Sequence, residues 1–110
     1  MTKPDYCQLW LTCKNKAEAD KITKALLDTR LVACVRQLPA NSSYWWDGKI
    51  NHSTEILLQM ESQVDSFDKV EKEVAKLHSY STFVLEATSV THVSKSAAKW
   101  LKSELQNGQA

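Results

Sequence analysis

The stretch that decides the fold of this chain is Ser43-Tyr44-Trp45-Trp46-Asp47-Gly48-Lys49-Ile50. It predicts a two-residue β-hairpin, because Asp47 and Gly48 tolerate the positive φ angles that such a turn requires. The residues on both sides of the turn predict strands. We therefore expect a long antiparallel hairpin in the middle of the sequence.

The first strand of this hairpin is expected to begin well before the turn. Residues 31–38 form a largely apolar run that is rich in β-branched side chains, which is typical of a strand. Pro39-Ala40-Asn41 is typical of a bulge or bend, so we expect the strand to be interrupted there and to resume at Ser42. The return strand carries Glu55-Ile56-Leu57-Leu58-Gln59-Met60.

Two amphipathic helices are predicted, one on each side of the hairpin in the sequence. Asn15 and Glu18 resemble a capping box, and the apolar residues that follow recur at helical spacing, which predicts a helix over residues 16–29. Ser62, with Asp65 three residues later, predicts the start of a second helix that ends near residue 78.

Further strands precede and follow these helices. Polar and apolar side chains alternate over residues 6–13, which predicts a half-buried strand. Residues 82–90 mix apolar and β-branched side chains and predict another strand. A short helix around Trp100 completes the order β-α-β-β-α-β-α.

This order favours an α+β fold for one domain over residues 1–110, the ferredoxin-like split β-α-β arrangement with an antiparallel sheet, an extended hairpin and a C-terminal helix. Both large helices then cover one face of the sheet. Tyr44, Trp45 and Trp46 are consecutive on a strand, so at least one of them projects away from the helices. Because burying such a side chain contributes roughly 1.5–3 kcal/mol, we expect a second subunit to cover it in a homo-oligomer.

The composition argues against several classes of function. The 110 residues include 14 Lys and Arg against 13 Asp and Glu, interleaved along the chain, so no basic stripe points to nucleic acid. Two glycines are too few for a glycine-rich phosphate loop. No apolar run is long enough to span a membrane and no signal-type core follows the N-terminus, so we expect a cytoplasmic protein. The three cysteines lack paired spacing, and we expect reduced thiols.

Ordered blocks of the sequence extend well beyond the hairpin. They are Thr12-Cys13, Arg30-Leu31-Val32-Ala33-Cys34-Val35, the hairpin stretch, Glu55-Ile56-Leu57-Leu58, Leu77-His78 with Tyr80, and Trp100-Leu101. In this order and spacing they resemble the CutA family of divalent-cation tolerance proteins. The resemblance implies a ferredoxin-like subunit with a PII-like architecture, a homotrimer made by strand pairing between subunits, and tolerance of divalent metals, copper especially. It brings no established reaction, so we expect a non-enzymatic protein.

The sequence departs from the family pattern after His78. Family members usually carry a proline directly after this histidine and a Pro-Glu pair where Phe83-Val84 stand here. The departure removes a carboxylate from the neighbourhood of the subunit clefts. A ligand that depends on that carboxylate would bind weakly or not at all.

Copper prefers thiolate in its reduced state and imidazole in its oxidised state, so only the cysteines and histidines are candidate soft ligands. They are Cys7, Cys13, Cys34, His52, His78 and His92, and none forms a spaced metal motif. Cys7 and Cys13 lie roughly 20 Å apart along one strand and cannot share an ion. Cys34 is expected in the core, and His52 and His92 on the surface.

Cys13 and His78 are the two metal ligands we predict. Cys13 ends a strand just before a helix N-terminus, where the helix dipole favours the thiolate; the alternative is a structural thiol. His78 matches the family histidine, and the alternative is a residue that caps and packs the end of its helix. In some bacterial members copper ligation is ascribed to this histidine together with a neighbouring histidine and a cysteine in the first strand. In this sequence Leu77 stands in place of the neighbouring histidine, and the position of the strand cysteine is nearer Leu11 than Cys13.

Two hypotheses about function follow. The first is a trimeric, non-enzymatic protein that binds copper or another divalent ion through His78 and Cys13, with Tyr44, Trp45 and Trp46 in the trimer interface. The second is a structural or signalling trimer of PII-like architecture whose subunit clefts bind a small molecule or a partner protein. The aromatic cluster is also a candidate ligand platform or RNA-stacking surface, but no basic stripe accompanies it.

Overall fold

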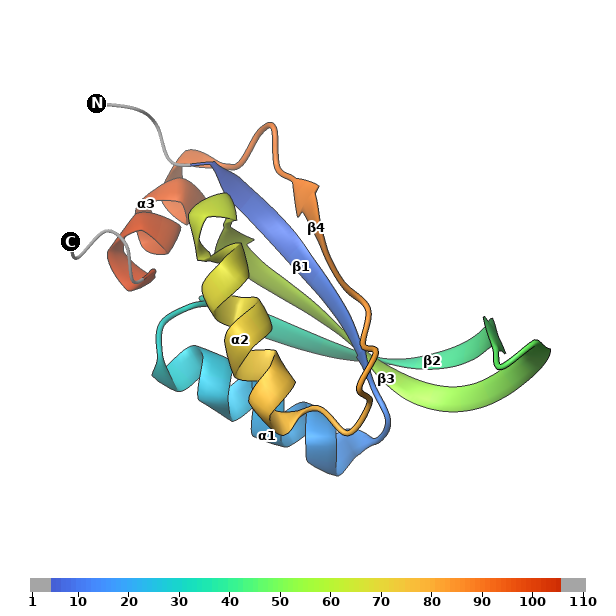
Figure 1. Ribbon diagram of the computed structural model, residues 1–110. Coiled ribbons are helices and arrows are strands. Elements are labelled where there is room, and N and C mark those ends of the chain that lie inside the picture. Colours follow the sequence, from blue (N-terminus) through green and yellow to red (C-terminus); the bar gives the residue numbers. More distant parts are fainter. Residues whose placement is uncertain (1–4, 106–110) are drawn as a thin grey trace.

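Residues 5–105, which the computed structural model describes, form one antiparallel sheet of four strands with three α-helices (Figure 1). The strand order across the sheet is β2-β3-β1-β4, so β2 and β4 are the edges. The elements in chain order are β1 (Tyr6–Cys13), α1 (Lys16–Asp28), β2 (Cys34–Trp46), β3 (Lys49–Gln63), a 3₁₀ turn (Val64–Ser66), α2 (Phe67–Leu77), β4 (Leu85–Ser89) and α3 (Lys95–Glu104). The predicted element order and the α+β class are confirmed.

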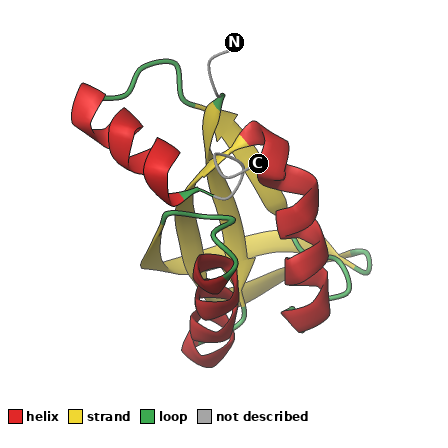
Figure 2. Cartoon of the chain, turned by 90° about the vertical axis from the view of Figure 1, so that its left-hand side faces the viewer, coloured by secondary structure: helices red, strands yellow, loops and turns green. Residues whose placement is uncertain are grey.

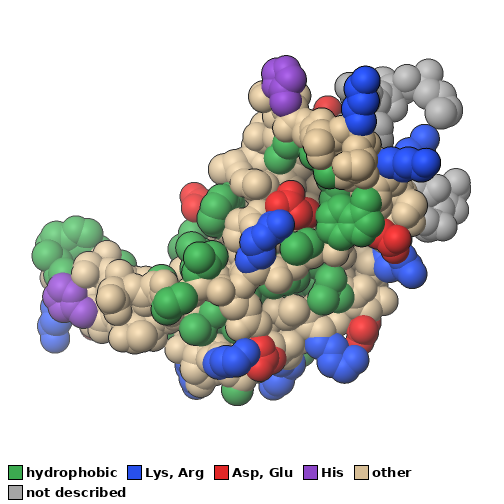
Figure 3. Space-filling view, turned by 180° about the vertical axis from the view of Figure 1, so that it is seen from behind, with side chains coloured by type: hydrophobic (Ala, Val, Ile, Leu, Met, Phe, Trp, Pro, Cys, Tyr) green, Lys and Arg blue, Asp and Glu red, His purple; other side chains and the backbone are tan. Residues whose placement is uncertain are grey.

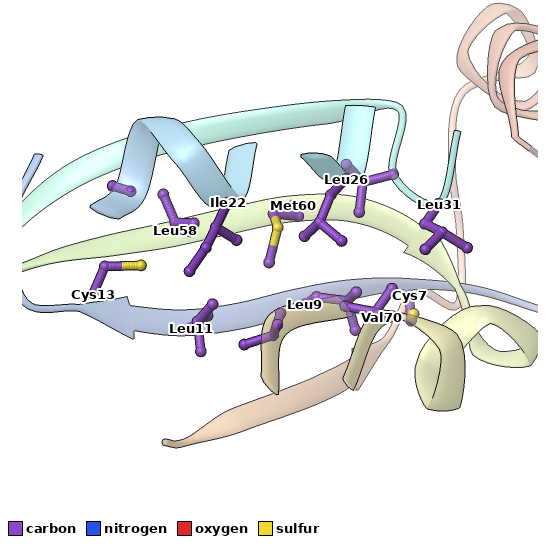
Figure 4. Packing of buried hydrophobic residues seen from close by; sticks show 13 residues of the cluster. Cys7, Leu9, Leu11, Cys13, Ile22, Leu26, Leu31, Leu58, Met60 and Val70 are labelled. Carbon is purple, nitrogen blue, oxygen red and sulfur yellow. The ribbon is translucent and has the colours of Figure 1, made fainter. Parts of the chain in front are cut away.

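The core lies between the sheet and the first two helices. Every second side chain of β1 is fully buried, which is the outcome that its alternating sequence predicts (Figure 4). Leu9 and Leu11 lie opposite Met60 and Leu58 of β3. The apolar side chains of α1 and α2, including Ile22 and Val70, pack onto the same face, so one sheet face is covered by both helices. Figure 2 shows α3 set apart from the other two helices.

The helices begin and end for local reasons. The Asn15 side chain caps α1 by accepting a hydrogen bond from the Glu18 amide at 2.9 Å, and Arg30, with a φ of 59°, turns the chain away after the helix. The predicted start of α2 at Ser62 is wrong. Ser62 is still in β3, where its hydroxyl donates to the Leu31 carbonyl at 2.7 Å, and a 3₁₀ turn separates the strand from the helix at Phe67.

The hairpin has the predicted turn. Trp46 pairs with Lys49, and positive φ angles at Asp47 (53°) and Gly48 (73°) produce the reversal. The hairpin arm projects from the body, and the molecule measures 49 × 25 × 21 Å (Figure 1).

The predicted interruption of β2 at Pro39 is wrong. The register runs without a break from Cys34 to Trp46, with Pro39 opposite Ile56. Because β2 is an edge strand, a residue without an N–H is tolerated there. Two strand boundaries also differ: β2 begins at Cys34, after a buried Leu31 and Val32 that fill the core, and β4 covers only residues 85–89.

The other face of the sheet is largely open. Its β1 side chains are half-buried, and α3 reaches only the Tyr6 end, where the Tyr6 hydroxyl donates to the Ala98 carbonyl at 3.5 Å. Trp45 and Trp46 on the arm are 73% and 57% exposed, so the expectation of an aromatic side chain away from the helices is confirmed. Figure 3 shows hydrophobic side chains along the arm and the adjoining body.

Substitution of the turn glycine tests this account of the hairpin. Gly48→Ala should lower the free energy of unfolding by about 1 kcal/mol, because an alanine at a φ of 73° is strained although nothing lies within 4 Å of its added methyl group. Denaturant titration measures the change, and Lys49→Ala, one residue further on, serves as the control. An unchanged stability in Gly48→Ala would contradict the turn geometry.

Candidate functional site

Three potential metal ligands meet where β1 leads into α1. The Cys13 sulfur, a Glu18 carboxylate oxygen and a His78 ring nitrogen all lie within 4.8 Å of one another. Cys13 comes from the end of β1, Glu18 from the first turn of α1, and His78 from the residue that follows α2. The structure thus brings together the two predicted ligands, and adds a third residue that the sequence indicated only as part of a helix cap.

The Glu18 carboxylate is held by the backbone on two sides. One oxygen accepts a hydrogen bond from the Lys14 amide at 2.8 Å, and the other accepts one from the Ser79 amide at 2.6 Å. Burial by itself raises the pKa of Glu18, but these hydrogen bonds and the neighbouring His78 outweigh it, and the pKa lies below its ordinary value. A buried carboxylate is therefore ionised next to Cys13 and His78 at neutral pH.

The His78 ring is fully enclosed and both of its nitrogens have partners. Nε2 lies 2.8 Å from the Thr12 carbonyl, and Nδ1 lies 3.0 Å from the Tyr80 amide nitrogen. A carbonyl can only accept and an amide N–H can only donate, so Nε2 carries the proton and Nδ1 accepts. Nε2 also lies 3.8 Å from Glu18 Oε2. The ring therefore joins the end of β1 to the loop after α2, and the end of α2 is capped by the backbone amide of His78, which donates to the Val74 carbonyl at 2.8 Å.

Phe83, which belongs to the loop before β4, packs against His78 of this group. Its ring stacks on His78 with 5.3 Å between centroids, whereas Val84 is exposed. The two residues that replace the family's Pro-Glu pair therefore differ in role: one packs on the histidine and the other faces solvent. The carboxylate near the histidine in this chain belongs to Glu18 on α1.

The expectation that the helix N-terminus favours a Cys13 thiolate is wrong. Burial, followed by the negative charges of Glu18 and Glu55, raises the pKa of Cys13 to about 12. The thiol is protonated at neutral pH in the metal-free protein. A metal ion that uses this sulfur must displace the proton.

The remaining candidate ligands lie elsewhere, and Cys13, Glu18 and His78 are the one such group in residues 5–105. Cys7 is buried at the opposite end of β1, with its pKa raised to about 11 by burial and by Glu61. The prediction that Cys34 lies in the core is wrong, because it is half-buried at the start of β2. His52 and His92 are exposed as expected.

The chemistry of the three ligands fits a borderline or soft divalent ion. Imidazole, thiolate and carboxylate are the groups that bind zinc, and imidazole and thiolate also suit copper. Ligand atoms of a tetrahedral zinc site are separated by about 3.4–3.6 Å, from metal–ligand bonds of about 2.0–2.3 Å. The His78–Glu18 separation of 3.8 Å is close to this value, and the 4.8 Å spread of the group would contract by about 1 Å.

A comparison with known families matches residues 7–104 to the CutA1 divalent ion tolerance protein family. The chain belongs to this family. The family description names tolerance of divalent ions and no reaction. Its CutA1 structural neighbours share the PII-like form of the ferredoxin-like fold, so the fold expected from the sequence is confirmed.

CutA proteins from distant organisms cover almost the whole chain. The divalent-cation tolerance protein CutA of Archaeoglobus fulgidus is 32% identical over 98 residues, which are 89% of this chain and 96% of the relative. Its structure, described as that of a periplasmic protein, has a TM-score of 0.89 at 31% identity and covers 92% of this chain and 99% of that one. CutA1 from Oryza sativa has a TM-score of 0.91 at 24% identity, over 96% and 98% of the two chains, which supports the fold.

The helices of residues 5–105 are too short or too polar to cross a membrane.

Glu18 is a potential ligand that was not predicted from the sequence, although one signal was present. A carboxylate three residues after a helix cap lies at the helix N-terminus, next to the end of the preceding strand. Here that strand ends at Cys13.

Replacement of the buried carboxylate tests the geometry of this CutA1 site. Glu18→Gln should lower the free energy of unfolding at pH 7 by about 1–3 kcal/mol, because a buried amide cannot replace both charge-assisted hydrogen bonds. The folded-state pKa of Glu18 lies below the ordinary value of 4.5, so ionised Glu18 stabilises the fold above that pH. The stabilisation is lost as the pH falls through the folded-state pKa.

The difference between wild type and Glu18→Gln should therefore narrow below about pH 4.5. Asp20→Asn, on an exposed side chain of the same helix, is the control and should change stability little. Denaturant titrations at several pH values measure both effects. A difference that does not change with pH would contradict an ionised, stabilising Glu18.

Proposed function

We propose that this CutA1-family chain acts in divalent-cation tolerance as a non-enzymatic homotrimer that binds copper at Cys13, Glu18 and His78. The observation that carries the proposal is the convergence of a sulfur, a carboxylate and an imidazole within 4.8 Å. The relatives' names support a role in divalent-cation tolerance.

The ligand set suits both oxidation states of copper. Cys13 would bind Cu(I) as a thiolate, whereas His78 and Glu18 would bind Cu(II). Binding requires the Cys13 proton to leave, and requires the ring proton of His78 to move from Nε2 to Nδ1 with loss of the hydrogen bonds to Thr12 and from Tyr80. The apparent affinity should therefore rise with pH, since protons compete with the metal for the Cys13 sulfur.

The trimer part of the proposal rests on the hairpin arm. Tyr44, Trp45 and Trp46 expose large apolar surfaces on the arm, and β2 offers an unpaired outer edge within the described sheet. Apolar surface of this kind and an open strand edge are features that are commonly covered when subunits associate.

Three free cysteines support the expected cytoplasmic location, because thiols stay reduced there.

A second candidate function is favoured by one observation, a cavity of about 610 Å³ at the base of the arm. Its volume is in the range of small-molecule sites. A trimer of PII-like architecture that binds a ligand between its subunits would need a cavity of this size. Thermal shifts caused by small molecules but not by copper would favour this candidate over the metal-binding one.

Copper titration of the reduced protein under anaerobic conditions tests the metal site. Cu(I) and Cu(II) should each bind with integral stoichiometry per subunit. Cys13→Ser should weaken Cu(I) binding, and His78→Ala should weaken Cu(II) binding, each by at least about 100-fold. This loss exceeds the one expected when a residue that only hydrogen-bonds to a metal ligand is removed. His52→Ala, at an exposed histidine, is the matched control. Equal affinities in all four proteins would contradict the site.

The mass in solution tests the assembly separately. Light scattering at micromolar concentration should give three times the mass of the chain. Trp45→Ser should shift the equilibrium towards monomers, whereas Trp100→Ser, which alters a less exposed tryptophan on α3, should not. A monomeric wild-type protein would contradict the trimer and leave the metal site to be judged by the titration.

A further inference from the structure

The cavity at the base of the hairpin arm contains a single charged group among the described residues that line it, the Glu55 carboxylate. The cavity holds about 610 Å³ and lies between the arm and the loop before β4. Tyr44, Trp45 and Trp46 contribute its aromatic walls, and Tyr80 belongs to the opposite side. No lysine or arginine among residues 5–105 lines it.

Glu55 is buried and has one hydrogen-bond partner among the described residues. Only 5% of the residue is exposed, and one hydrogen bond reaches its carboxylate, from the Tyr80 hydroxyl to Oε2 at 3.0 Å. A buried carboxylate is costly unless it is paired or fully hydrogen-bonded. Its negative charge extends to its neighbours: after burial and this hydrogen bond, it helps to raise the pKa of Tyr80 to about 12. A cation in the cavity would give this carboxylate an ionic partner in addition to the Tyr80 hydroxyl.

The walls indicate which kind of cation would fit. Tyr44 and Trp46 occupy alternate positions of β2 and therefore share a sheet face. Glu55 of β3 lies opposite Ala40, which points to the same face. Aromatic faces attract organic cations and pack against their apolar parts. Magnesium and calcium sites are usually built on several carboxylates, whereas Glu55 is the one carboxylate among the described residues that line the cavity.

We propose that this cavity is a binding site for a small organic ammonium ion with an apolar body. Its charged nitrogen pairs with Glu55, and its apolar part lies against Tyr44, whose hydroxyl reaches Ser53, two residues from Glu55. The site is the cavity of the second candidate function, on which this inference rests, and it is separate from the Cys13, Glu18 and His78 group. It lies on the face of the arm that the proposed trimer uses, so binding is measured on the protein as it assembles in solution.

Three ligands of similar shape and different charge provide the test. Isothermal titration calorimetry is performed with 2-phenylethylammonium, 2-phenylethanol and 3-phenylpropionate. The ammonium ion should bind at least about 10-fold more tightly than the alcohol, and the carboxylate should not bind, since Glu55 repels it. Failure of the ammonium ion to bind at millimolar concentration, or equal affinity for the alcohol, would overturn the proposal. This comparison uses only the wild-type protein.

Variants then locate the site. Glu55→Gln keeps the size of the side chain and removes its charge, and should reduce ammonium affinity at least about 10-fold. Glu71→Gln, at an exposed acid on α2, should leave the affinity unchanged. Tyr44→Leu should also weaken binding, because it removes the aromatic ring next to Glu55, and light scattering on the same variant shows whether its assembly is unchanged. Unchanged affinity in folded Glu55→Gln would overturn the assignment.

The outcomes are distinguishable from those of the copper titration. Integral copper binding without ammonium binding would refute only this inference. Ammonium binding without copper binding would refute the proposed metal function and leave this site standing.

Discussion

The buried Glu18 carboxylate is the constraint on which the functional end of the molecule depends. It joins the turn after β1, through the Lys14 amide, to the turn after α2, through the Ser79 amide. Ser79 lies between His78, which bonds back to Thr12, and Tyr80, which reaches across to Glu55. One ion with two backbone donors therefore positions a candidate metal ligand and a wall of the neighbouring cavity. Such charge-assisted hydrogen bonds are stronger than neutral ones.

Two carboxylates thus lie close to this loop in contrasting states. Glu18 is surrounded by donors and its pKa is lowered, whereas Glu55 has a single donor and faces a cavity. Both charges act on Cys13, whose pKa they raise after burial has done so. A negative potential in a water-poor region attracts cations of either kind, metal or organic, and the ligand atoms decide which one fits where. The sulfur and imidazole favour a metal at one end, and the aromatic walls favour an ammonium ion at the other.

Much of the fold could be predicted from the sequence, since its signals are local. The alternation in β1, the Asn15 cap and the Asp47-Gly48 turn each depend on neighbouring residues, and all three are confirmed. Pro39 and Ser62 misled because their meaning depends on tertiary context: an edge strand tolerates the proline, and a buried carbonyl of Leu31 uses the serine hydroxyl. In the site, Cys13 and His78 could be proposed as ligands, but Glu18 and the protonated thiol could not, because long-range hydrogen bonds and burial determine them.

Glu18 and His78 hold the loop over residues 78–80 rigidly in place, and amide hydrogen exchange tests this role most directly. The Ser79 amide donates to Glu18 and the Tyr80 amide donates to His78. If the claim is right, both amides exchange slowly, with opening free energies within about 1–2 kcal/mol of those of central β1 amides such as Leu11. Exchange of Ser79 and Tyr80 at the rates of unprotected loop amides would contradict it.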